Sequence, residues 1–187
     1  MTDPIYSGGC LSISGGGLSI SGGCLSISGG CLSISGGCQC GAVRYKIEGA
    51  LGDAGICHCR MCQKAFGSWG AALVTVPIKN LTWTRGQPAE FRSSPVVARG
   101  FCKDCGTPLY MQEDGHTLYD VAIGTLDDPN AVGAFSGQVG VESKVAWFDT
   151  LHSLPQKSTD NDRTPEDLAK LVTRQHPDRD TDVWPPR

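Results

Sequence analysis

Seven of the ten cysteines in this sequence fall into three tight clusters whose spacing suits metal binding. In chain order they are Cys38, Cys40, Cys57, Cys59, Cys62, Cys102 and Cys105. Thiolates are soft ligands that suit zinc, and a closed structural zinc site takes four protein ligands. Seven thiols therefore fill one closed site and leave three for a second site with an open position, where chemistry can take place. An iron–sulfur cluster uses the same ligand type and is the main alternative.

Two of the clusters have spacings with a simple geometric meaning. Residues two apart in an extended strand point to the same side, so Cys38 and Cys40 can bind one ion together. Cys102 and Cys105, followed by Gly106, have the spacing of a zinc knuckle, in which a tight turn directs both sulfur atoms to one metal. Spacing alone leaves open which clusters share an ion.

The length and composition of the whole chain limit the classes of protein to which it can belong. The 187 residues are enough for one domain with a hydrophobic core and tails, and 40% of them are hydrophobic. A formal charge of -3 without a basic stripe argues against nucleic-acid binding. No apolar run approaches the ~20 residues that cross a bilayer, and the N-terminus lacks the pattern of a secretory signal. We therefore expect a cytoplasmic protein without membrane partners, in which closely spaced cysteines bind metal or react instead of forming disulfides.

The N-terminal part of the chain is a repeat of seven residues, Gly-Gly-(Cys or Gly)-Leu-Ser-Ile-Ser, in four copies over residues 8–35. This unit is too short for the familiar solenoid repeats. Gly-Gly pairs break helices, so we expect residues 1–35 to be a flexible or weakly ordered tail. Short strands that add to a sheet edge are the alternative. Cys10, Cys24 and Cys31 lie in this tract without a close partner and are interpreted as spare thiols.

Residues 36–155 have the composition of a β-rich domain, which we predict to be the zinc-binding domain. Val43, Tyr45 and Ile47 alternate along residues 42–47 and predict a strand. Further strands are predicted at residues 71–77, 81–84, 96–101, 118–124 and 145–148. Short strands separated by Gly, Pro, Asn and Asp turns, with no long amphipathic helix, favour an all-β architecture over a parallel βαβ sheet.

Residues 156–187 form a polar and charged C-terminal tail. Within it, Thr164 is a suitable N-cap, Pro165 suits the first helical position, and two acidic residues follow in the first turn. These features predict a short helix that ends near Arg174.

Several segments resemble the successive signatures of the glutathione-dependent formaldehyde-activating enzyme family, which includes the centromere protein V domain. They are Gly37-Cys38-Gln39-Cys40-Gly41-Ala42-Val43-Arg44-Tyr45, Cys57-His58-Cys59-Arg60-Met61-Cys62-Gln63-Lys64 and Phe101-Cys102-Lys103-Asp104-Cys105-Gly106-Thr107-Pro108-Leu109-Tyr110. The likeness continues through residues 123–129 and 141–148 and so covers residues 36 to about 155. The resemblance implies an Mss4-like, or β-tent, fold of small antiparallel sheets assembled around zinc.

The resemblance also implies two zinc ions per chain and divides the cysteines between them. It assigns a structural zinc to Cys38, Cys40, Cys102 and Cys105, and a second zinc, associated with activity, to Cys57, Cys59 and Cys62. The count of seven thiols agrees with that division. The repeat departs from the short N-terminus of the family, and it leaves open whether Cys31 reaches the second metal.

A zinc ion held by three thiolates suits thiol chemistry. Its coordination shell is negatively charged, so it is a weaker Lewis acid than a zinc held by neutral histidines, but it can bind one more thiolate. An incoming thiol such as that of glutathione would lose its proton and become a positioned nucleophile near neutral pH. Attack on formaldehyde would give S-hydroxymethylglutathione, the carbon–sulfur lyase activity that the family name implies.

Two other functions remain open at this point. One is a non-catalytic zinc-binding module for a protein or chromatin partner, as the centromere protein V likeness suggests, although the net charge argues against chromatin. The other is a zinc enzyme that acts on a different small thiol. Tight zinc at both sites would favour a module, and one zinc that is labile to chelators would favour an enzyme.

Residues near the second cluster carry weaker expectations. His58 would point away from the metal if it lay in a strand, which favours a place behind the ligands or at the surface. Arg60 and Lys64 flank the open site and could attract a carboxylate of a peptide-like thiol, although such charges are more often solvated. The aromatic side chains are expected in the core or the wall of the site; they are Trp69, Trp147 and Phe148.

Overall fold

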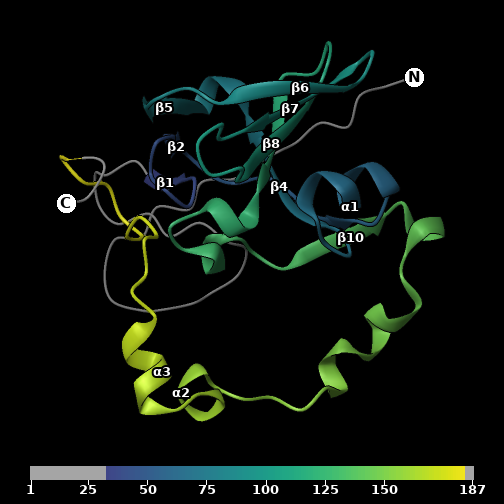
Figure 1. Ribbon diagram of the computed structural model, residues 1–187. Helices are drawn as coiled ribbons and strands as arrows, with labels where there is room; N and C mark the ends of the chain where they lie inside the picture. Colours follow the sequence, from purple (N-terminus) through teal and green to yellow (C-terminus); the bar gives the residue numbers. More distant parts are fainter. Residues whose placement is uncertain (1–32, 184–187) are drawn as a thin grey trace, which may run out of the picture.

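The computed structural model describes residues 33–183, which form two β-sheets with short helices around them (Figure 1). The strands are β1 (Ser33–Gly37), β2 (Arg44–Glu48), β3 (Ala54–Cys57), β4 (Ala71–Pro77), β5 (Leu81–Arg85), β6 (Ala89–Ser94), β7 (Val97–Phe101), β8 (Pro108–Glu113), β9 (Leu118–Ala122) and β10 (Phe135–Val139). The α-helices are α1 (Arg60–Phe66), α2 (Thr159–Asp162) and α3 (Pro165–Lys170). Short 3-10 helices lie at Ile78–Asn80, Ile123–Thr125, Pro129–Ala131, Val141–Ser143 and Ala146–Ser153. The prediction of a mainly β, Mss4-like fold with a short C-terminal helix is confirmed.

The larger sheet has seven strands in the order β10-β3-β4-β9-β8-β7-β6, and the smaller sheet has three in the order β1-β2-β5. Neighbouring strands are antiparallel except β10 and β3, which are parallel. Strand β4 has a neighbour on each side and coincides with the predicted strand at residues 71–77. Its branched residues Val74 and Val76 are fully buried, as suits an inner strand. Pro77 ends the strand because proline has no N–H for the ladder.

One face of the larger sheet packs against the smaller sheet to make the main core. Residues that pair directly across antiparallel strands share a face, and Val74, Val121 and Tyr110 form such a row over β4, β9 and β8. They belong to one buried cluster with Tyr45 and Ile47 of the smaller sheet. This core therefore holds the two sheets together.

The opposite face of the larger sheet carries a different row of paired residues. From β4 to β6 these are Thr75, Asp120, Met111, Arg99 and Phe91. Helix α1 covers this face, since its Cys62 and Phe66 pack with Ala71, Leu73 and Met111 in a second cluster. The charged residues Asp120 and Arg99 therefore lie in the same row as Met111, which packs against α1.

Strand β1 is the end of the repeat tract, and its two glycines are required by close packing. A Cβ atom at Gly36 would lie 2.4 Å from the Tyr45 Oη, and one at Gly37 would lie 2.5 Å from the carbonyl oxygen of Val43. Neither position can hold a side chain without moving its neighbours. The earlier copies of the repeat lie outside the described residues, together with Cys10, Cys24 and Cys31.

A buried ion pair joins the smaller sheet to the segment after β9. Arg44 on β2 is 2% exposed, and its Nη1 donates to the Asp127 Oδ1 at 2.7 Å. Asp127 also accepts a hydrogen bond from the Ser35 hydroxyl, and Asp180 of the C-terminal tail accepts two more from Arg44. Burial alone would raise the pKa of Asp127, but the bonds from Arg44 and Ser35 outweigh it and lower that pKa.

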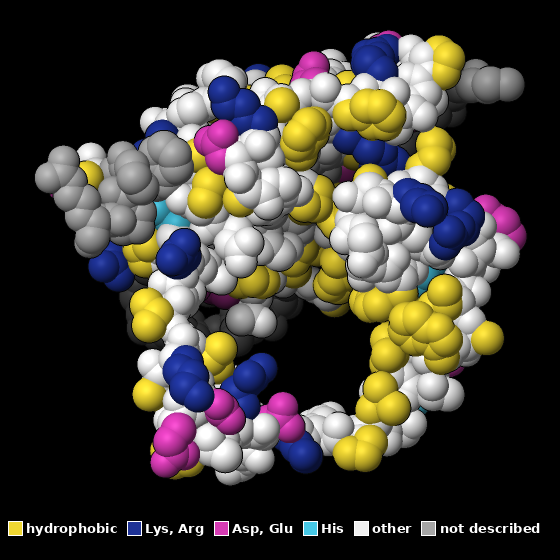
Figure 2. Space-filling model, in the orientation of Figure 1, with side chains coloured by type: hydrophobic (Ala, Val, Ile, Leu, Met, Phe, Trp, Pro, Cys, Tyr) yellow, Lys and Arg dark blue, Asp and Glu magenta, His cyan; other side chains and the backbone are white. Residues whose placement is uncertain are grey.

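After β10 the chain leaves the sheets as an arm and then returns to them. The arm contains α2 and α3 and encloses an opening that is visible in Figure 2, where hydrophobic side chains follow the arm. Trp147 and Leu154 of this segment are 52% and 56% exposed. The returning tail is held by the His176 amide, which donates to the Gln39 carbonyl at 2.7 Å.

The structure corrects the sequence predictions at several elements. The predicted strand at residues 145–148 is wrong, because the chain there is part of a 3-10 helix, Ala146–Ser153. This segment lies on the arm, where it pairs with no strand, and Lys144 binds Asp149 one turn later. The C-terminal helix begins after the Thr164 cap as predicted but ends at Lys170 instead of near residue 174.

Other elements were not predicted. They are helices α1 and α2 and strands β3, β6, β8 and β10. Strand β1 is the edge strand of the smaller sheet, so residues 33–35 follow the alternative of a short strand at a sheet edge and not that of a flexible tail. Among residues 33–183 no helix combines the length and the apolar content that crossing a bilayer requires.

Replacing Asp127 by Asn should destabilise the domain, because Arg44 would lose its buried anionic partner and keep only Asp180. We expect a loss of about 2–3 kcal/mol in the free energy of unfolding at pH 7. Since the folded pKa of Asp127 is lowered, its contribution is present above the unfolded pKa of about 3.9 and disappears as pH falls through the folded value. The measurement is urea unfolding between pH 3 and 7.

The control is Asp114→Asn, which makes the same chemical change in the exposed pair between Asp114 and Arg92. It should leave the unfolding midpoint unchanged. Equal effects of the two substitutions would show that the buried pair is not important for stability.

Candidate metal centre

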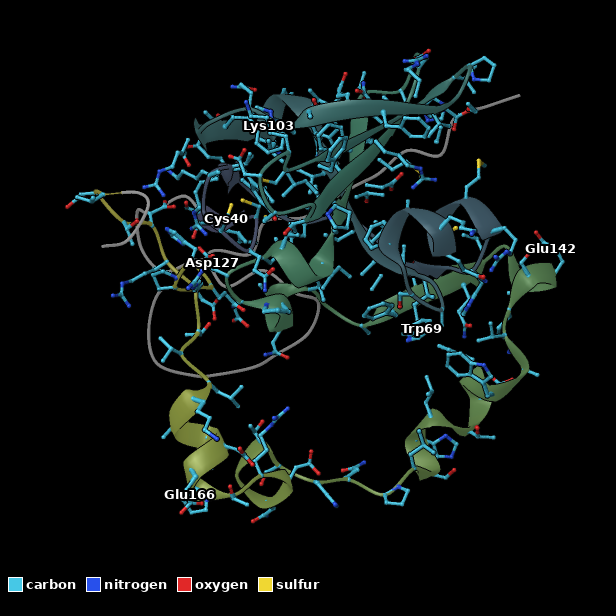
Figure 3. The ribbon with its side chains drawn as sticks, viewed as in Figure 1. Cys40, Trp69, Lys103, Asp127, Glu142 and Glu166 are labelled. Atoms are coloured by element: carbon cyan, nitrogen blue, oxygen red, sulfur yellow. The ribbon has the colours of Figure 1, made fainter. Side chains whose placement is uncertain are left out.

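Four cysteines from two distant parts of the chain meet where the two sheets join. Cys38 and Cys40 follow β1 of the smaller sheet, whereas Cys102 and Cys105 follow β7 of the larger sheet. Their sulfur atoms all lie within 4.8 Å of one another. In Figure 3 the labelled Cys40 and Asp127 lie on the same side of the domain, and Trp69 lies on the other side, below α1.

Two similar turns present these four thiols. The Cys38 amide donates to the Val43 carbonyl at 2.9 Å, and the Cys102 amide donates to the Thr107 carbonyl at the same distance. Each turn has a glycine with positive φ directly after its second cysteine, at Gly41 and Gly106, both at 76°. A side chain would strain this left-handed backbone, so the Cys-Gly steps are part of the site.

The sulfur geometry of this group fits a tetrahedral zinc ion. With a Zn–S distance of about 2.3 Å, the sulfur atoms of a tetrahedron lie about 3.8 Å apart. The Cys38 and Cys40 sulfur atoms are 3.6 Å apart, and those of Cys40 and Cys102 are 3.8 Å apart. A hydrogen bond from the Val43 amide to the Cys38 Sγ, at 3.2 Å, further suits a thiolate at that position.

Three further cysteines meet at the N-terminus of α1. Cys57 is the last residue of β3, Cys59 is the N-cap of α1, and Cys62 lies in the first helical turn. Their sulfur atoms lie within 4.8 Å of one another, and no fourth His, Cys, Asp or Glu of residues 33–183 joins the group. The group thus has one ligand fewer than a closed tetrahedral site. An open position is the arrangement of catalytic zinc sites.

The pKa values of these three thiols are shifted in different directions. Burial raises the pKa of Cys57 to about 12 and also raises that of Cys62. For Cys59, burial is outweighed mainly by the hydrogen bond from the Cys62 amide, so its pKa is lowered. Cys59 therefore ionises most readily, while burial favours the protonated thiols of Cys57 and Cys62. A divalent cation would displace those protons, and its binding strengthens as pH rises.

A buried polar cluster holds the loop between Cys57 and Cys59. His58 is fully buried, so the surface position considered from the sequence is wrong. Its Nε2 lies 2.8 Å from the Gln138 Oε1, and its ring packs edge-on against Phe148 at 4.8 Å between centroids. The Gln63 amide nitrogen donates to the carbonyls of His58 and Ser143. These contacts place the 3-10 segment after β10 directly behind the cysteines.

Gly140 allows that segment to approach the cysteines closely. It has φ of 65°, and a Cβ atom there would lie 2.7 Å from the backbone nitrogen of Cys59. Any larger residue would push Cys59 away or move the segment. Gly140 is therefore a component of the site, although nothing in its sequence context indicated one.

Two hollows lie next to the three-cysteine group, one lined by Cys57 and the other by Arg99, which contacts Cys62. One, of about 230 Å³, lies beside Cys57 and is lined mainly by apolar residues, together with Asp120 and Asp53. The other, of about 520 Å³, lies between α1 and the β6–β7 hairpin and includes Arg60, Lys64 and Arg99. The Arg99 Nη2 donates to the Cys62 Sγ at 3.6 Å.

The structure thus brings the seven predicted site residues into the two groups that the family resemblance implied. Arg60 and Lys64 line a hollow beside the smaller group, as the flanking position suggested. Trp69 packs against Phe148 at 4.8 Å, but Trp147 is half exposed and is not in the core. Sequence reasoning missed Arg99 and Asp120, because their proximity depends on strand register.

Comparison with known proteins gives a family match and a similar solved structure. A family model described as "Glutathione-dependent formaldehyde-activating enzyme" matches residues 33–137. A crystal structure of a protein from Rhodobacter sphaeroides is similar, with 25% sequence identity and a TM-score of 0.46 over 56% of this chain and 99% of that chain. No match is found among curated proteins.

Replacing Gly140 by Ala should weaken the smaller metal group alone, because the new Cβ would displace Cys59. Metal analysis of purified protein should fall from about two zinc ions per chain to about one. Gly133→Ala is the control, since a Cβ there meets nothing within 4 Å. Full zinc content in the Gly140 variant would show that this close contact does not position the ligands.

Proposed function

This chain belongs to the glutathione-dependent formaldehyde-activating enzyme family, and from that premise we propose that it is a zinc-dependent carbon–sulfur lyase. The reaction adds glutathione, or a similar small thiol, to formaldehyde, or cleaves such an adduct in the reverse direction. The observation that supports this function best is the three-cysteine group, which is one ligand short of closure and lies next to two hollows. A reducing compartment such as the cytoplasm would keep these thiols available.

Two sets of cysteines would hold two zinc ions in this proposal. The structural ion would be held by Cys38, Cys40, Cys102 and Cys105, and the second by Cys57, Cys59 and Cys62. Zinc at the second set would supply a position where an incoming thiol loses its proton and is kept as a thiolate. The role of the protein is to orient the reactants and to manage protons around that position.

The buried contacts behind the cysteines keep the group rigid during the reaction. Gln63 ties the backbone of His58 to that of Ser143, and Arg99 donates to the Cys62 sulfur. A donor to this sulfur reduces the negative charge that three thiolates would otherwise concentrate there. Cys57 lines the smaller hollow, and in this proposal the thiol and formaldehyde reach the cysteines there.

Asp120 is the best candidate for the group that supplies a proton. It lines the hollow beside Cys57, and burial raises its pKa by more than the nearby charge of His116 lowers it. When sulfur attacks formaldehyde, one carbon–sulfur bond forms and the carbonyl electron pair moves to oxygen. The Asp120 carboxyl donates its proton to that oxygen and recovers one from the solvent, which receives the thiol proton.

A non-catalytic zinc module is the alternative function. A module needs two closed and inert metals, whereas an enzyme of this type needs one exchangeable metal. The missing fourth ligand among the described residues favours the enzyme. A zinc enzyme for a different small thiol would use the same site, and only the substrate would differ.

The proposed reaction can be tested by exchange spectroscopy in NMR. Carbon-13 formaldehyde and glutathione form their adduct slowly on their own, and the protein should raise the exchange rate at least about tenfold. Cys62→Ser, which removes one ligand of the smaller group, should abolish that increase while the structural group stays loaded with zinc. An exchange rate that is the same with and without the wild-type protein would rule out the proposed reaction.

Replacing Asp120 by Asn should lower the exchange rate about tenfold to a hundredfold without changing the zinc content. Because the pKa of Asp120 is raised, its protonated form persists to higher pH, and the wild-type rate should decline as pH rises through that pKa. The Asn variant should lose this decline. Asp53→Asn, at a second carboxyl that lines the same hollow, is the matched control and should keep both the rate and the pH profile.

A further inference from the structure

The hollow between α1 and the β6–β7 hairpin is built from one face of each element. From α1 it takes Arg60, Met61, Lys64 and Ala65, at the spacing of neighbouring turns. From the hairpin it takes Phe91, Ser93 and Arg99. Phe91 and Arg99 are direct cross-strand partners, so their side chains lie on the same face, next to each other.

Arg99 is a buried residue that lines this hollow, and one of its guanidinium nitrogens has no hydrogen-bond acceptor among the described residues. It is 7% exposed, its Nε donates to the Ser93 hydroxyl at 3.0 Å, and its Nη2 donates to the Cys62 Sγ at 3.6 Å. The buried Nη1 has no hydrogen-bond partner among the described residues. A buried charged donor without an acceptor is costly, so its presence indicates a ligand that supplies one.

The charge of the hollow defines the kind of ligand. Three cationic side chains line it, Arg60, Lys64 and Arg99, and no acidic residue of the described chain does. None of the three forms an ion pair with a carboxylate within residues 33–183. Figure 2 shows Lys and Arg side chains gathered over α1 and beside the hairpin. Phe91 and Met61, which are 63% and 49% exposed, add an apolar rim.

We infer that this hollow is a carboxylate subsite and that Arg99 selects thiols that carry a carboxylate over neutral thiols. The inference rests on the proposed function, because it places the anionic end of the thiol substrate. Arg99 contacts the cysteine group through its Nη2 and also lines the hollow, so one residue joins the two ends of such a substrate. A planar guanidinium matches a carboxylate better than an ammonium group does, which favours Arg over Lys here.

The size of the hollow agrees with a small peptide thiol. Its volume of about 520 Å³ falls within the usual range of pockets for small ligands. A carboxylate at Arg99 would leave the rest of the ligand between the apolar rim and the two surface cations. Arg60 and Lys64 are more exposed, so we expect them to attract the anion and to contribute less to selectivity than Arg99 does.

The test is binding of S-methylglutathione to the zinc-loaded full chain by isothermal titration calorimetry. This ligand has both carboxylates but no free thiol, so binding reports the carboxylate contacts without the reaction. We expect the wild type to bind it at least about tenfold more tightly than its diethyl ester. Arg99→Met should remove that preference, and Arg99→Lys should keep part of it.

Arg92→Gln is the matched control, because Arg92 lies on β6 between Phe91 and Ser93 but points to the other side, where it binds Asp114. It should preserve the preference for the acid over the ester. Zinc content and thermal unfolding, measured for each variant, detect a merely structural effect of Arg99. If Arg99→Met does not fold, the acid-to-ester ratio of the wild type and of Arg99→Lys decides the question.

The possible results separate this inference from the proposed function. Equal binding of acid and ester by the wild type, or undetectable binding of both, would overturn the inference. So would unchanged acid binding in a zinc-loaded Arg99→Met protein. If binding depends on Arg99 but the protein does not accelerate formaldehyde exchange, the carboxylate subsite stands and only the reaction is wrong.

Discussion

The convergence of four sulfur atoms at the junction of the two sheets is the constraint on which the remaining structure depends. Two of them come from the turn after β1 and two from the turn after β7, so one ion there would cross-link the sheets. Because no such site exists in an unfolded chain, the free energy of metal binding at this point would contribute to folding. The hydrophobic core and the Arg44–Asp127 ion pair are further contacts that hold the same two sheets together.

Once the sheets are joined, the larger one can serve two purposes. One face of this sheet packs into the main core, and the opposite face packs against α1 and the three-cysteine group. The residues that stabilise the fold and the residues of the proposed site therefore lie on opposite faces of the same sheet. Adjacent residues of a strand face opposite sides of the sheet. Substitutions on β4, β8 and β9 should therefore affect mainly stability when the residue faces the core, and mainly activity when it faces α1.

Much of this could be predicted from the sequence, because ligand type and spacing are local properties. The cysteine clusters, the strand at Ala71–Pro77 and the capped helix after Thr164 all rest on neighbouring residues. Arg99 and Asp120 could not be predicted, because both reach the site only through the pairing of β9, β8 and β7. The error at residues 145–148 has a related cause: a short apolar run forms a strand only where another strand is available to pair with it.

Gly36 and Gly37 pack too closely against Tyr45 and Val43 to be replaced by larger residues, and this limits how the repeat before them can change in length. Each unit of that tract ends in Leu-Ser-Ile-Ser and is followed by Gly-Gly, as in the sequence that leads into Cys38. Loss or gain of a whole unit by replication slippage would thus leave an identical junction with the domain. By contrast, an insertion or deletion that put any other residue at position 36 or 37 would place a side chain against Tyr45 or the Val43 carbonyl.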